Sequence, residues 1–206
     1  MKPPLPPVGA GQADGGTSFQ GFWQVEDSLP QRLGRLGYHT SFLTSSELSF
    51  SQTGDWARQL GFAEVLGADN PAFVGQRRFH FNSVPDALLL EDAAQKILAQ
   101  PQPAFYFIKT VSTHHPFVNP ETGEASQQAA FTYTDRSVAA FYQQLERAGF
   151  FKDGVLLVVG DHHAMVPLQA QEIQRSGVVR APAHVPLMVI DQRRSTQQVT
   201  QRTAAQ

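Results

Sequence analysis

The stretch that decides the fold is residues 154–163, which read GVLLVVGDHH. Its apolar core, mostly β-branched, has no polar break, which predicts a strand buried on both faces of a parallel sheet. A carboxylate and two imidazoles follow directly after the strand. In open α/β sheets, ligands bind just beyond the carboxyl ends of the strands. The pattern therefore places Asp161, His162 and His163 where α/β enzymes carry out their chemistry.

These residue types suit a divalent metal ion. Asp and neutral His ligate Zn²⁺ or Mn²⁺ through oxygen and nitrogen, and Gly160 permits an unusual turn that lets neighbouring side chains serve one ion. A complete site needs about three or four ligands. The alternative is a loop in which Asp161 caps the next helix and the two His side chains are solvated. This stretch alone leaves both interpretations open.

Composition limits the class of protein. The 206 residues are enough for one domain with a core, and an apolar fraction of 41% with a charged fraction of 17% is typical of a soluble globular protein. The net charge of -2 gives no reason to expect a nucleic-acid partner. Without Cys, disulfides and thiolate chemistry are excluded. No apolar run approaches the roughly 20 residues of a membrane span, and the start of the chain lacks the apolar segment of a signal peptide.

The chain divides by composition into an arm and a domain. Residues 1–27 are rich in Pro and Gly and predict a linker or irregular arm, whereas residues 28–206 carry the elements of the domain. Within the arm, residues 15–18 (GGTS) can form a turn into a short helix. The hydroxyl of Thr17 at this point suits either a helix cap or a nucleophile.

Hydrophobic periodicity predicts helices that alternate with strands. Helices are expected over residues 28–36, 55–60, 83–100 and 134–148, and strands over 38–44, 105–111, 154–159 and 185–190. Residues 62–81 are expected to be irregular, and residues 119–130 to form a polar loop. The alternation is typical of an α/β fold with a mainly parallel sheet flanked by helices. Right-handed crossovers then put the ends of strands 105–111 and 154–159 at one edge.

The other His residues differ in their expected roles. A second pair, His114 and His115, follows the strand expected over 105–111 and so belongs to the same predicted edge. His39, within a strand, and His80, among aromatic residues, are expected to be structural. His184 precedes the last strand and lies at the opposite edge if that strand is parallel. Two roles stay open for His115 and His163: each is either solvated or orients a neighbouring metal-binding residue.

Taken together, these segments resemble the sulfatase-like branch of the alkaline phosphatase superfamily, and within it the lipoteichoic acid synthases and phosphoglycerol transferases. The resemblance covers about residues 28–190. It rests on segments that occur in the same order as in the family. The segment from Ser28 to Gly37-Tyr38 resembles the helix and turn before the family's GY strand, and the segment from Ser49-Phe50 to Gly61-Phe62 resembles the next one, which ends in GF. THHPF at 113–117 corresponds to the family's SNHxPF motif, Tyr133 and Asp135 to its YxD motif, and Gly160-Asp161-His162 to its GDH motif.

The resemblance implies a metal-dependent hydrolase or transferase that acts on phosphodiesters of the phosphoglycerol type or on sulfate esters through a Thr or Ser nucleophile. In the family an acidic residue, an Asp-His pair and the nucleophile hold a divalent metal, often Mn²⁺ or Zn²⁺. By motif, Asp161 and His162 are metal ligands and His114 lies near the substrate's oxyanion or leaving group. His115 is implied as a further substrate-binding residue, and Thr17 as the nucleophile.

The resemblance also implies a substrate and a location. The substrate is a phosphate or sulfate ester linked to a phospholipid or a glycan. Full-length relatives are expected on the extracytoplasmic, periplasmic side of the bacterial inner membrane, with membrane spans that this chain lacks.

The chain departs from the family pattern in its first part. Residues 1–27 contain no strand that ends in the family's acidic metal ligand, and the gap from Thr17 to Ser28 is short. Ser51 and Thr53 stand where lipoteichoic acid synthases tend to have Trp and Arg, which argues against a glycerol phosphate pocket like theirs. The alternative expectation is therefore a truncated, catalytically incomplete domain without turnover. A third interpretation is an unrelated α/β binding module with incidental His residues.

One motif has a competing explanation. Residues 28–32 (SLPQR) match the S-x-P-x-R core whose Ser is oxidised to formylglycine in true sulfatases. However, Ser28 and Gln31 also form the pattern of a capping box at the start of an amphipathic helix. Helix capping is thus the expected role of Ser28.

Overall fold

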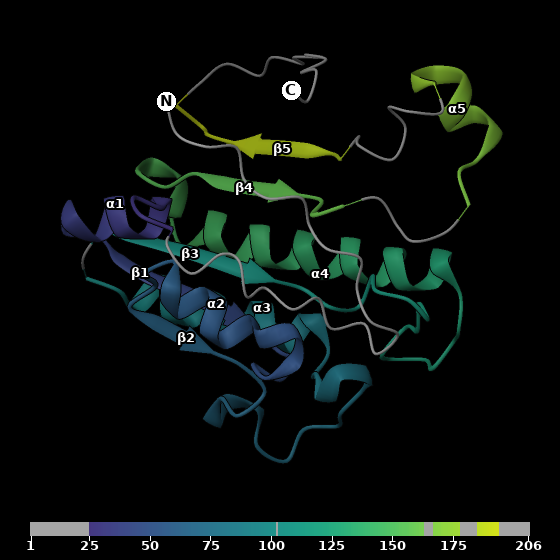
Figure 1. Ribbon diagram of the computed structural model, residues 1–206, viewed down its shortest axis with the longest axis horizontal. Coiled ribbons are helices and arrows are strands. Elements are labelled where there is room, and N and C mark those ends of the chain that lie inside the picture. The colour runs from purple at the N-terminus through teal and green to yellow at the C-terminus, as the bar shows by residue number, and fades with distance from the viewer. Residues whose placement is uncertain (1–24, 102, 163–166, 178–184, 194–206) are drawn as a thin grey trace. The chain divides into compact units, whose positions relative to one another are not determined.

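Three strands form a parallel sheet, and two of them, β1 and β3, lie where the sequence predicts strands. The structure is a computed structural model that describes residues 25–101, 103–162, 167–177 and 185–193. Strands β1 (His39–Thr44), β2 (Glu64–Leu66) and β3 (Ala104–Lys109) pair in the order β2–β1–β3 (Figure 1). The α/β fold with a parallel sheet is thereby confirmed. β2 corrects the expectation that residues 62–81 are irregular throughout, because this short strand gains its structure by pairing with β1 rather than from its own pattern.

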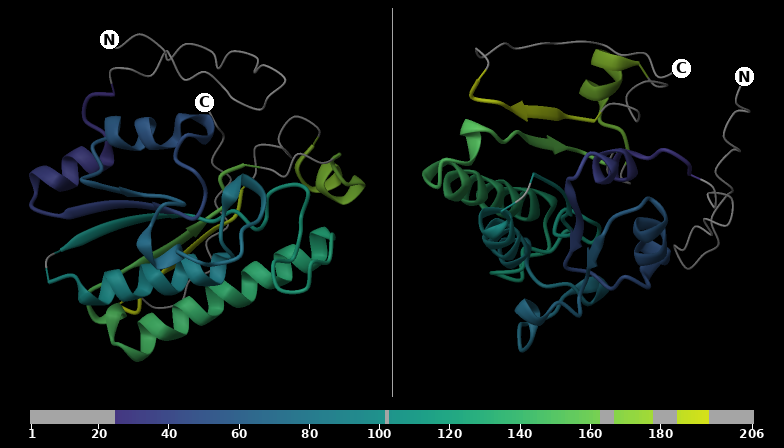
Figure 2. Two further views of the ribbon diagram at one scale, coloured as in Figure 1. Left: turned by 90° about the horizontal axis from the view of Figure 1, so that it is seen from below. Right: turned by 90° about the vertical axis from the view of Figure 1, so that its left-hand side faces the viewer.

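Helices cover both faces of this sheet (Figure 2). On one face, α2 (Thr53–Gln59) packs through Ala57 and Trp56 against Phe42, which is fully buried at the centre of β1. The ring of Phe107 on β3 stacks on Phe42 at 5.5 Å. On the opposite face lies α3 (Asp86–Ala99), where the hydroxyl of Tyr106 donates to a backbone carbonyl of the helix.

The first helix begins where its sequence predicts. α1 (Leu29–Arg35) has Ser28 as its N-cap, and the Ser28 hydroxyl accepts the N–H of Gln31 while the Gln31 side chain accepts the N–H of Ser28. The Ser28 hydroxyl also donates to the carbonyl of Leu60. The capping box is confirmed, and these hydrogen bonds give Ser28 a complete structural role. Gly37, at φ 86°, then turns the chain into β1.

The helix α4 (Gln127–Arg147) is longer than expected. Its start was predicted at residue 134, but Ser126 accepts the N–H of Ala129 at 3.0 Å and caps the helix a full two turns earlier. Tyr133, which is 1% exposed, explains the difference, because its hydroxyl accepts the N–H of Ala87 at 3.0 Å and fixes the added turns against α3. The polar loop expected over 119–130 is therefore shorter than predicted.

Short 3₁₀ helices complete the irregular segments of the chain. They are η1 (Phe50–Gln52), η2 (Pro71–Phe73), η3 (His80–Asn82) and η4 (Phe150–Lys152). Residues 1–24, most of the arm expected over 1–27, lie outside the described residues. None of the helices in the described ranges is long and apolar enough to cross a membrane.

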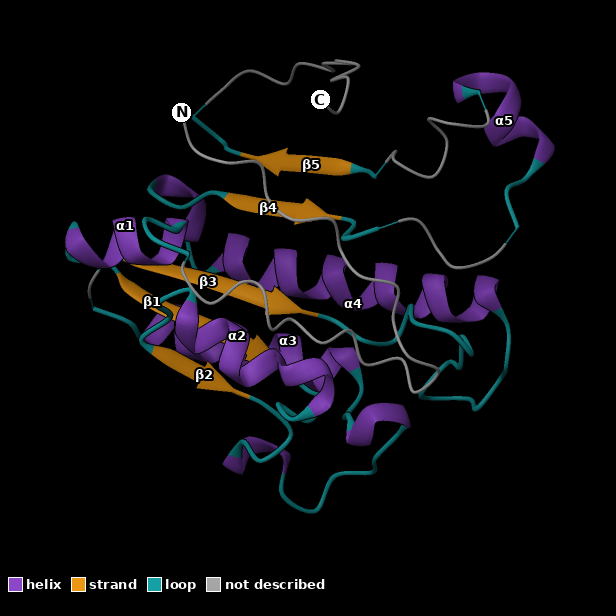
Figure 3. Cartoon of the chain, in the orientation of Figure 1, coloured by secondary structure: helices purple, strands orange, loops and turns teal. Residues whose placement is uncertain are grey.

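By its contacts the chain divides into two compact units, residues 1–142 and 143–206. In the second unit, β4 (Leu156–Val159) pairs with β5 (Leu187–Ile190) in an antiparallel sheet, and α5 (Ala170–Ser176) lies between them in sequence (Figure 3). The prediction that β4 is buried on both faces is wrong, since Leu157 and Val159 are 58% and 56% exposed. An unbroken apolar run shows that a strand has no polar face, but it does not show what covers that strand.

Candidate active site

The polar residues of the first unit gather at the carboxyl edge of the parallel sheet. Thr44, the last residue of β1, lies opposite Lys109, the last residue of β3, so the segments that follow these strands begin side by side. Ser45 and Ser46 follow β1, and residues 110–115 follow β3. Ser45 is fully buried, and its hydroxyl has no hydrogen-bond partner among the described residues. This edge is the place at which α/β proteins bind ligands.

Asp86 holds the segment that carries the His pair. Its side chain is fully buried in the first turn of α3 and accepts the backbone N–H groups of Val111 at 2.9 Å and Ser112 at 3.0 Å. Burial raises the pKa of Asp86, and the two N–H donors oppose that rise because they favour the carboxylate. A single carboxyl group therefore positions the loop from which His114 projects. In the sequence, Asp86 could be recognised only as an acidic residue in the first turn of a predicted helix, and nothing indicated its hydrogen bonds to this loop.

The ring of His114 has one defined hydrogen bond. Its Nδ1 lies 2.6 Å from the carbonyl oxygen of His115. A carbonyl only accepts, so Nδ1 carries a hydrogen, and Nε2 of the neutral ring holds the lone pair. The ring also makes an edge contact with Phe81, with centroids 4.7 Å apart. His115 is exposed, and its ring lies 5.6 Å from that of Phe117.

A second imidazole also contacts Phe81. The ring of His80 meets Phe81 at 5.3 Å, which confirms its predicted place among aromatic side chains. Burial lowers the pKa of His80, a nearby His114 lowers it further, and a hydrogen bond with the backbone of Val111 acts in the opposite direction. Nε2 of His80 is buried and has no partner among the described residues. The sequence did not reveal that His80 adjoins His114.

In the second unit, Asp161 and His162 follow β4 as predicted. Their side chains are 77% and 54% exposed, and Oδ2 of Asp161 lies 3.6 Å from Nε2 of His162. The other carboxylate oxygen accepts the backbone N–H of His162 at 2.9 Å. An oxygen and a nitrogen donor therefore lie close together on the surface of this unit.

Three further residues considered from the sequence cannot be placed. Thr17, the predicted nucleophile, and the histidines His163 and His184 lie outside the described residues. Within the part of the chain that the structure describes, no group of three or more His, Cys, Asp or Glu side chains has the arrangement of a metal site. The Asp161–His162 pair thus fits a divalent ion by donor type and spacing, but it supplies fewer ligands than a complete site requires.

The observed pairings bear on two expectations about the sheet edges. β4 pairs with β5 and with no other described strand, so no described pairing joins it to the sheet of β3, and the shared edge of the two strands stays a prediction. The position of His184 was inferred for a parallel last strand, but β5 is antiparallel. The N–H of Gly160 donates to the carbonyl of Pro186 at 3.0 Å, so the start of β5 lies beside the residue that precedes Asp161. Pairing partners are long-range properties that strand patterns do not contain.

Comparison with known proteins identifies the family. The sequence profile of the Sulfatase family matches residues 7–206. The chain belongs to the sulfatase family. The match covers both units, including the segment after β3 with His114 and the segment after β4 with Asp161, so the resemblance that the short motifs indicated is confirmed.

Among curated proteins, this sulfatase-family chain is similar to phosphoglycerol transferase I of Escherichia coli, with 25% identity over 170 residues, which are 75% of the chain and 22% of the relative. It is also similar to lipoteichoic acid synthase 1 of Bacillus subtilis, with 22% identity over 152 residues, 67% of the chain and 24% of the relative. The chain therefore spans less than a quarter of the length of these relatives.

Solved structures confirm the alkaline phosphatase superfamily fold. A lipoteichoic acid synthase from Listeria monocytogenes matches with a TM-score of 0.65 and 20% identity, covering 81% of this chain and 46% of that one. A superfamily protein from Vibrio parahaemolyticus matches with a TM-score of 0.65 and 21% identity, covering 79% and 40%. A phosphoglycerol transferase from Streptococcus pyogenes in complex with sn-glycerol-1-phosphate matches with a TM-score of 0.54 and 14% identity, covering 75% and 43%.

Proposed function

We propose that this chain is the metal-binding part of a sulfatase-like hydrolase or transferase that acts on phosphodiesters or sulfate esters. The observation that carries the proposal is the separation of 3.6 Å between Oδ2 of Asp161 and Nε2 of His162. Two ligands of a tetrahedral ion at about 2.1 Å are about 3.4 Å apart. The pair therefore has nearly the spacing that one Zn²⁺ or Mn²⁺ requires.

A bound divalent ion supplies positive charge that stabilises an oxyanion and activates a coordinated hydroxyl. His114 is the proposed substrate-binding and catalytic imidazole. With Nδ1 committed to the His115 carbonyl, Nε2 is the atom that meets an ester oxygen, and its protonated form gives a proton to the leaving oxygen, which departs as the alcohol. His115, exposed on the same segment, is a further proposed substrate contact.

Thr17 is the proposed nucleophile. Its hydroxyl oxygen bonds to the phosphorus or sulfur atom, the bond to the leaving oxygen breaks, and the alcohol departs with a proton. Water or an acceptor alcohol then attacks the new ester and regenerates the Thr17 hydroxyl. Hydrolysis and transfer thus differ only in the molecule that attacks in the second step, which is water in one case and an alcohol in the other.

The substrate is proposed from the relatives. The matched Escherichia coli and Bacillus subtilis proteins are a phosphoglycerol transferase and a lipoteichoic acid synthase, and the Streptococcus pyogenes structure holds sn-glycerol-1-phosphate. These names support a phosphate ester of the phosphoglycerol type. Its linkage to a phospholipid or glycan, and its place on the extracytoplasmic side of a bacterial membrane, are proposed from the family resemblance. Ser51 and Thr53, in place of the expected Trp and Arg, argue for a different fit around the glycerol unit.

A second candidate function is a sulfatase-family domain that binds metal weakly and has no turnover of its own. The number of donors favours it, because the described residues contain no set of three metal ligands. This candidate predicts that aryl phosphodiesters and aryl sulfates are not hydrolysed by the chain.

The experiment that tests the proposal is metal content after loading with Mn²⁺ or Zn²⁺, measured on the wild type and on Asp161→Ala. We expect nearly one ion per chain in the wild type and a loss of most of it in the variant. Asp153→Ala is the matched control, because Asp153 is another exposed carboxylate of the same unit. Metal content that Asp161→Ala leaves unchanged refutes the assignment of the ligands.

A further inference from the structure

A polar cluster lies at the amino edge of the parallel sheet, at the other end of its strands from the candidate active site. It consists of His39 and Ser41 on β1 and Glu64, the first residue of β2, and we call it the amino-edge cluster. Side chains two residues apart on a strand share a face, and Ser41 lies opposite Glu64 in the register of β1 and β2. His39 is five residues from Thr44, so the cluster begins about 16 Å along β1 from the carboxyl edge.

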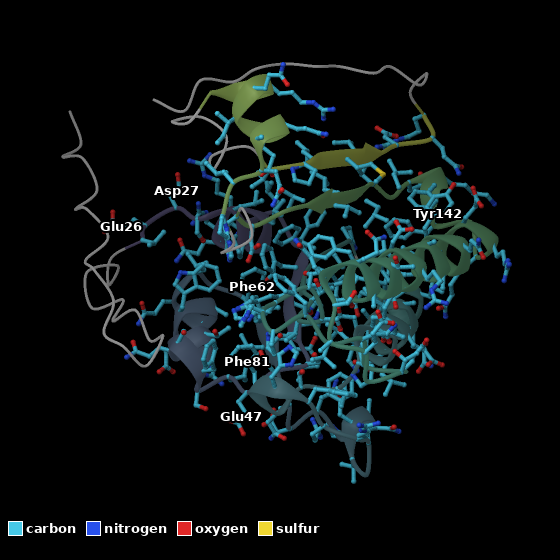
Figure 4. The ribbon with its side chains drawn as sticks, turned by 90° about the vertical axis from the view of Figure 1, so that its right-hand side faces the viewer. Glu26, Asp27, Glu47, Phe62, Phe81 and Tyr142 are labelled. Atoms are coloured by element: carbon cyan, nitrogen blue, oxygen red, sulfur yellow. The ribbon has the colours of Figure 1, made fainter. Side chains whose placement is uncertain are left out.

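The cluster occupies the face of the sheet opposite to the aromatic core. Phe42, the neighbour of Ser41 in β1, points to the other face, where its ring lies 5.7 Å from that of Phe62 (Figure 4). On the face of the cluster, Tyr106 of β3 lies opposite Ser41 in register, and its ring is tilted against that of His39 at 6.3 Å. Three strands thus position the cluster, and one aromatic ring borders it.

Three donor atoms of the cluster converge. Oγ of Ser41 lies 2.9 Å from Nε2 of His39 and 2.8 Å from Oε2 of Glu64, and the last two atoms are 3.6 Å apart. Ligands at about 2.1 Å from one ion are about 3.0 Å apart in an octahedral and about 3.4 Å apart in a tetrahedral arrangement. An ion about 2.1 Å from all three atoms would lie about 1 Å outside the plane that they define. The separations are therefore those of ligands around a single divalent ion.

The two strong ligands of the cluster are open to solvent. The side chains of His39 and Glu64 are 30% and 36% exposed, whereas Ser41 is fully buried. An imidazole nitrogen and a carboxylate oxygen are ordinary ligands of Zn²⁺, and a neutral hydroxyl is a weaker third one. Because two ligands face solvent, an ion can enter and water can complete its coordination.

The hydrogens of the metal-free cluster have defined positions. A carboxylate only accepts, so the Ser41 hydroxyl donates to Glu64. Since that hydrogen is used, Oγ accepts from His39, and Nε2 of the neutral ring carries the hydrogen. A metal ion needs the lone pair of Nε2, so its binding moves the ring hydrogen to Nδ1. The tautomer of His39 therefore distinguishes an occupied site from a hydrogen-bonded network.

We propose that the amino-edge cluster is a second divalent-metal site, which binds Zn²⁺ through His39, Ser41 and Glu64. Hydrogen bonds alone account for the contacts of Ser41, but they do not require the spacing of 3.6 Å between the nitrogen and the carboxylate oxygen. The imidazole disfavours Mg²⁺ and Ca²⁺, which prefer sites made of oxygen ligands. With one neutral ligand among three, the site releases its ion when free metal is removed. It therefore adds nothing to the metal content that tests Asp161, and it does not rest on the proposed function.

The test is a titration of the full chain with Zn²⁺ at about pH 7.5, where an ordinary imidazole is mainly neutral. Long-range ¹H–¹⁵N spectra follow the His side chains, and His39→Gln identifies the signals. We expect His39 to change from the Nε2–H form to the Nδ1–H form as Zn²⁺ is added, and Mg²⁺ at the same concentration to leave it unchanged. Glu64→Gln keeps the shape of the side chain and an acceptor for Ser41 but lacks the charge. It should raise the midpoint of the Zn²⁺ titration at least about tenfold.

Two control variants make the result specific. Glu91→Gln, at an exposed position of α3, is the matched control and should leave the response of His39 unchanged. Asp161→Ala should also leave it unchanged, so this variant separates the two metal proposals and either can fail alone. The proposal is overturned if Zn²⁺ leaves the tautomer of His39 in the wild type unchanged, a result that depends on no variant. A folded Glu64→Gln chain that responds like the wild type overturns it as well.

Discussion

The buried carboxyl group of Asp86 accepts the backbone N–H of Ser112 at 3.0 Å, and so ties the start of α3 to the loop that carries His114. The neighbouring N–H of Val111 binds the same group at 2.9 Å. Two adjacent donors on one carboxyl group fix the direction in which the chain leaves β3. Helix, loop and candidate site are thereby coupled through one side chain.

Replacement of Asp86 by Asn should destabilise the fold. The amide oxygen can accept one of the two N–H groups, but the amide NH₂ then faces the other donor. We expect the free energy of unfolding to fall by about 1 to 3 kcal/mol, measured by urea denaturation. Asp69→Asn, at an exposed position, is the control and should change little. Equal stability of both variants would contradict the anchoring role of Asp86.

The pH dependence of the same variant gives a second measurement. Burial raises the pKa of Asp86 above its ordinary value of 3.8, so above that pH the native chain binds more protons than the unfolded chain. The contribution of this group is therefore greatest below pH 3.8 and is lost as pH rises through the native pKa. Asp86→Asn should lack this negative slope. A slope that persists in the variant belongs to other groups.

His80 should act in the opposite direction. Burial lowers the pKa of His80 below its ordinary value of 6.5, so the native chain binds fewer protons than the unfolded chain in the interval below that value. Its contribution is present above pH 6.5 and is lost as pH falls toward the native pKa. We expect His80→Gln to lose less stability than the wild type between pH 7 and about pH 5. Thermal unfolding of both proteins at each pH measures this loss. The same change in stability with pH in the wild type and in His80→Gln would refute the lowered pKa of His80.

Local signals in the sequence were sufficient for some elements. Ser28 and Gln31 define the start of α1 through side chain and backbone groups three residues apart, so a window of a few residues contains the whole interaction. The start of α4 was missed because Tyr133 fixes it against Ala87, on another helix. The pairing of β4 with β5 is equally non-local. Apolar runs predict strands well, but they do not choose the partners of those strands.

The residues of the candidate site also divide into those that local sequence could identify and those that it could not. His114, Asp161 and His162 could be named because they follow strands and match motifs of the family. Asp86 and Phe81 could not, because one acts through hydrogen bonds to a distant loop and the other through a left-handed backbone. Asn82 was the only local hint of that backbone, since Asn adopts the left-handed conformation more readily than most residues.

Gly61 offers a test of the contact between α1 and the turn before β2. Its φ is 84°, and a Cβ atom at this position would lie 2.4 Å from Cγ of Gln31, the capping-box side chain. Gly61→Ala should therefore cost about 2 to 3 kcal/mol, from backbone strain and loss of the cap. Gly34→Ala is the control, because Gly34 is helical with open space around its Cβ position, and it should stabilise the chain slightly. Denaturant unfolding compares the two, and equal effects would show that the contact with Gln31 does not matter.

The tautomer of His114 is a prediction that needs no catalytic activity. Its Nδ1 lies 2.6 Å from the His115 carbonyl, so the neutral ring should carry its hydrogen on Nδ1. Long-range ¹H–¹⁵N spectra distinguish the two tautomers, and His114→Gln identifies the signals. A neutral ring with its hydrogen on Nε2 would mean that the contact with His115 is not formed in solution. If the Nδ1–H form is observed, Nε2 can donate to an ester oxygen only after the ring gains a second proton, so the same imidazole accepts a hydrogen bond in one charge state and supplies a proton in the other.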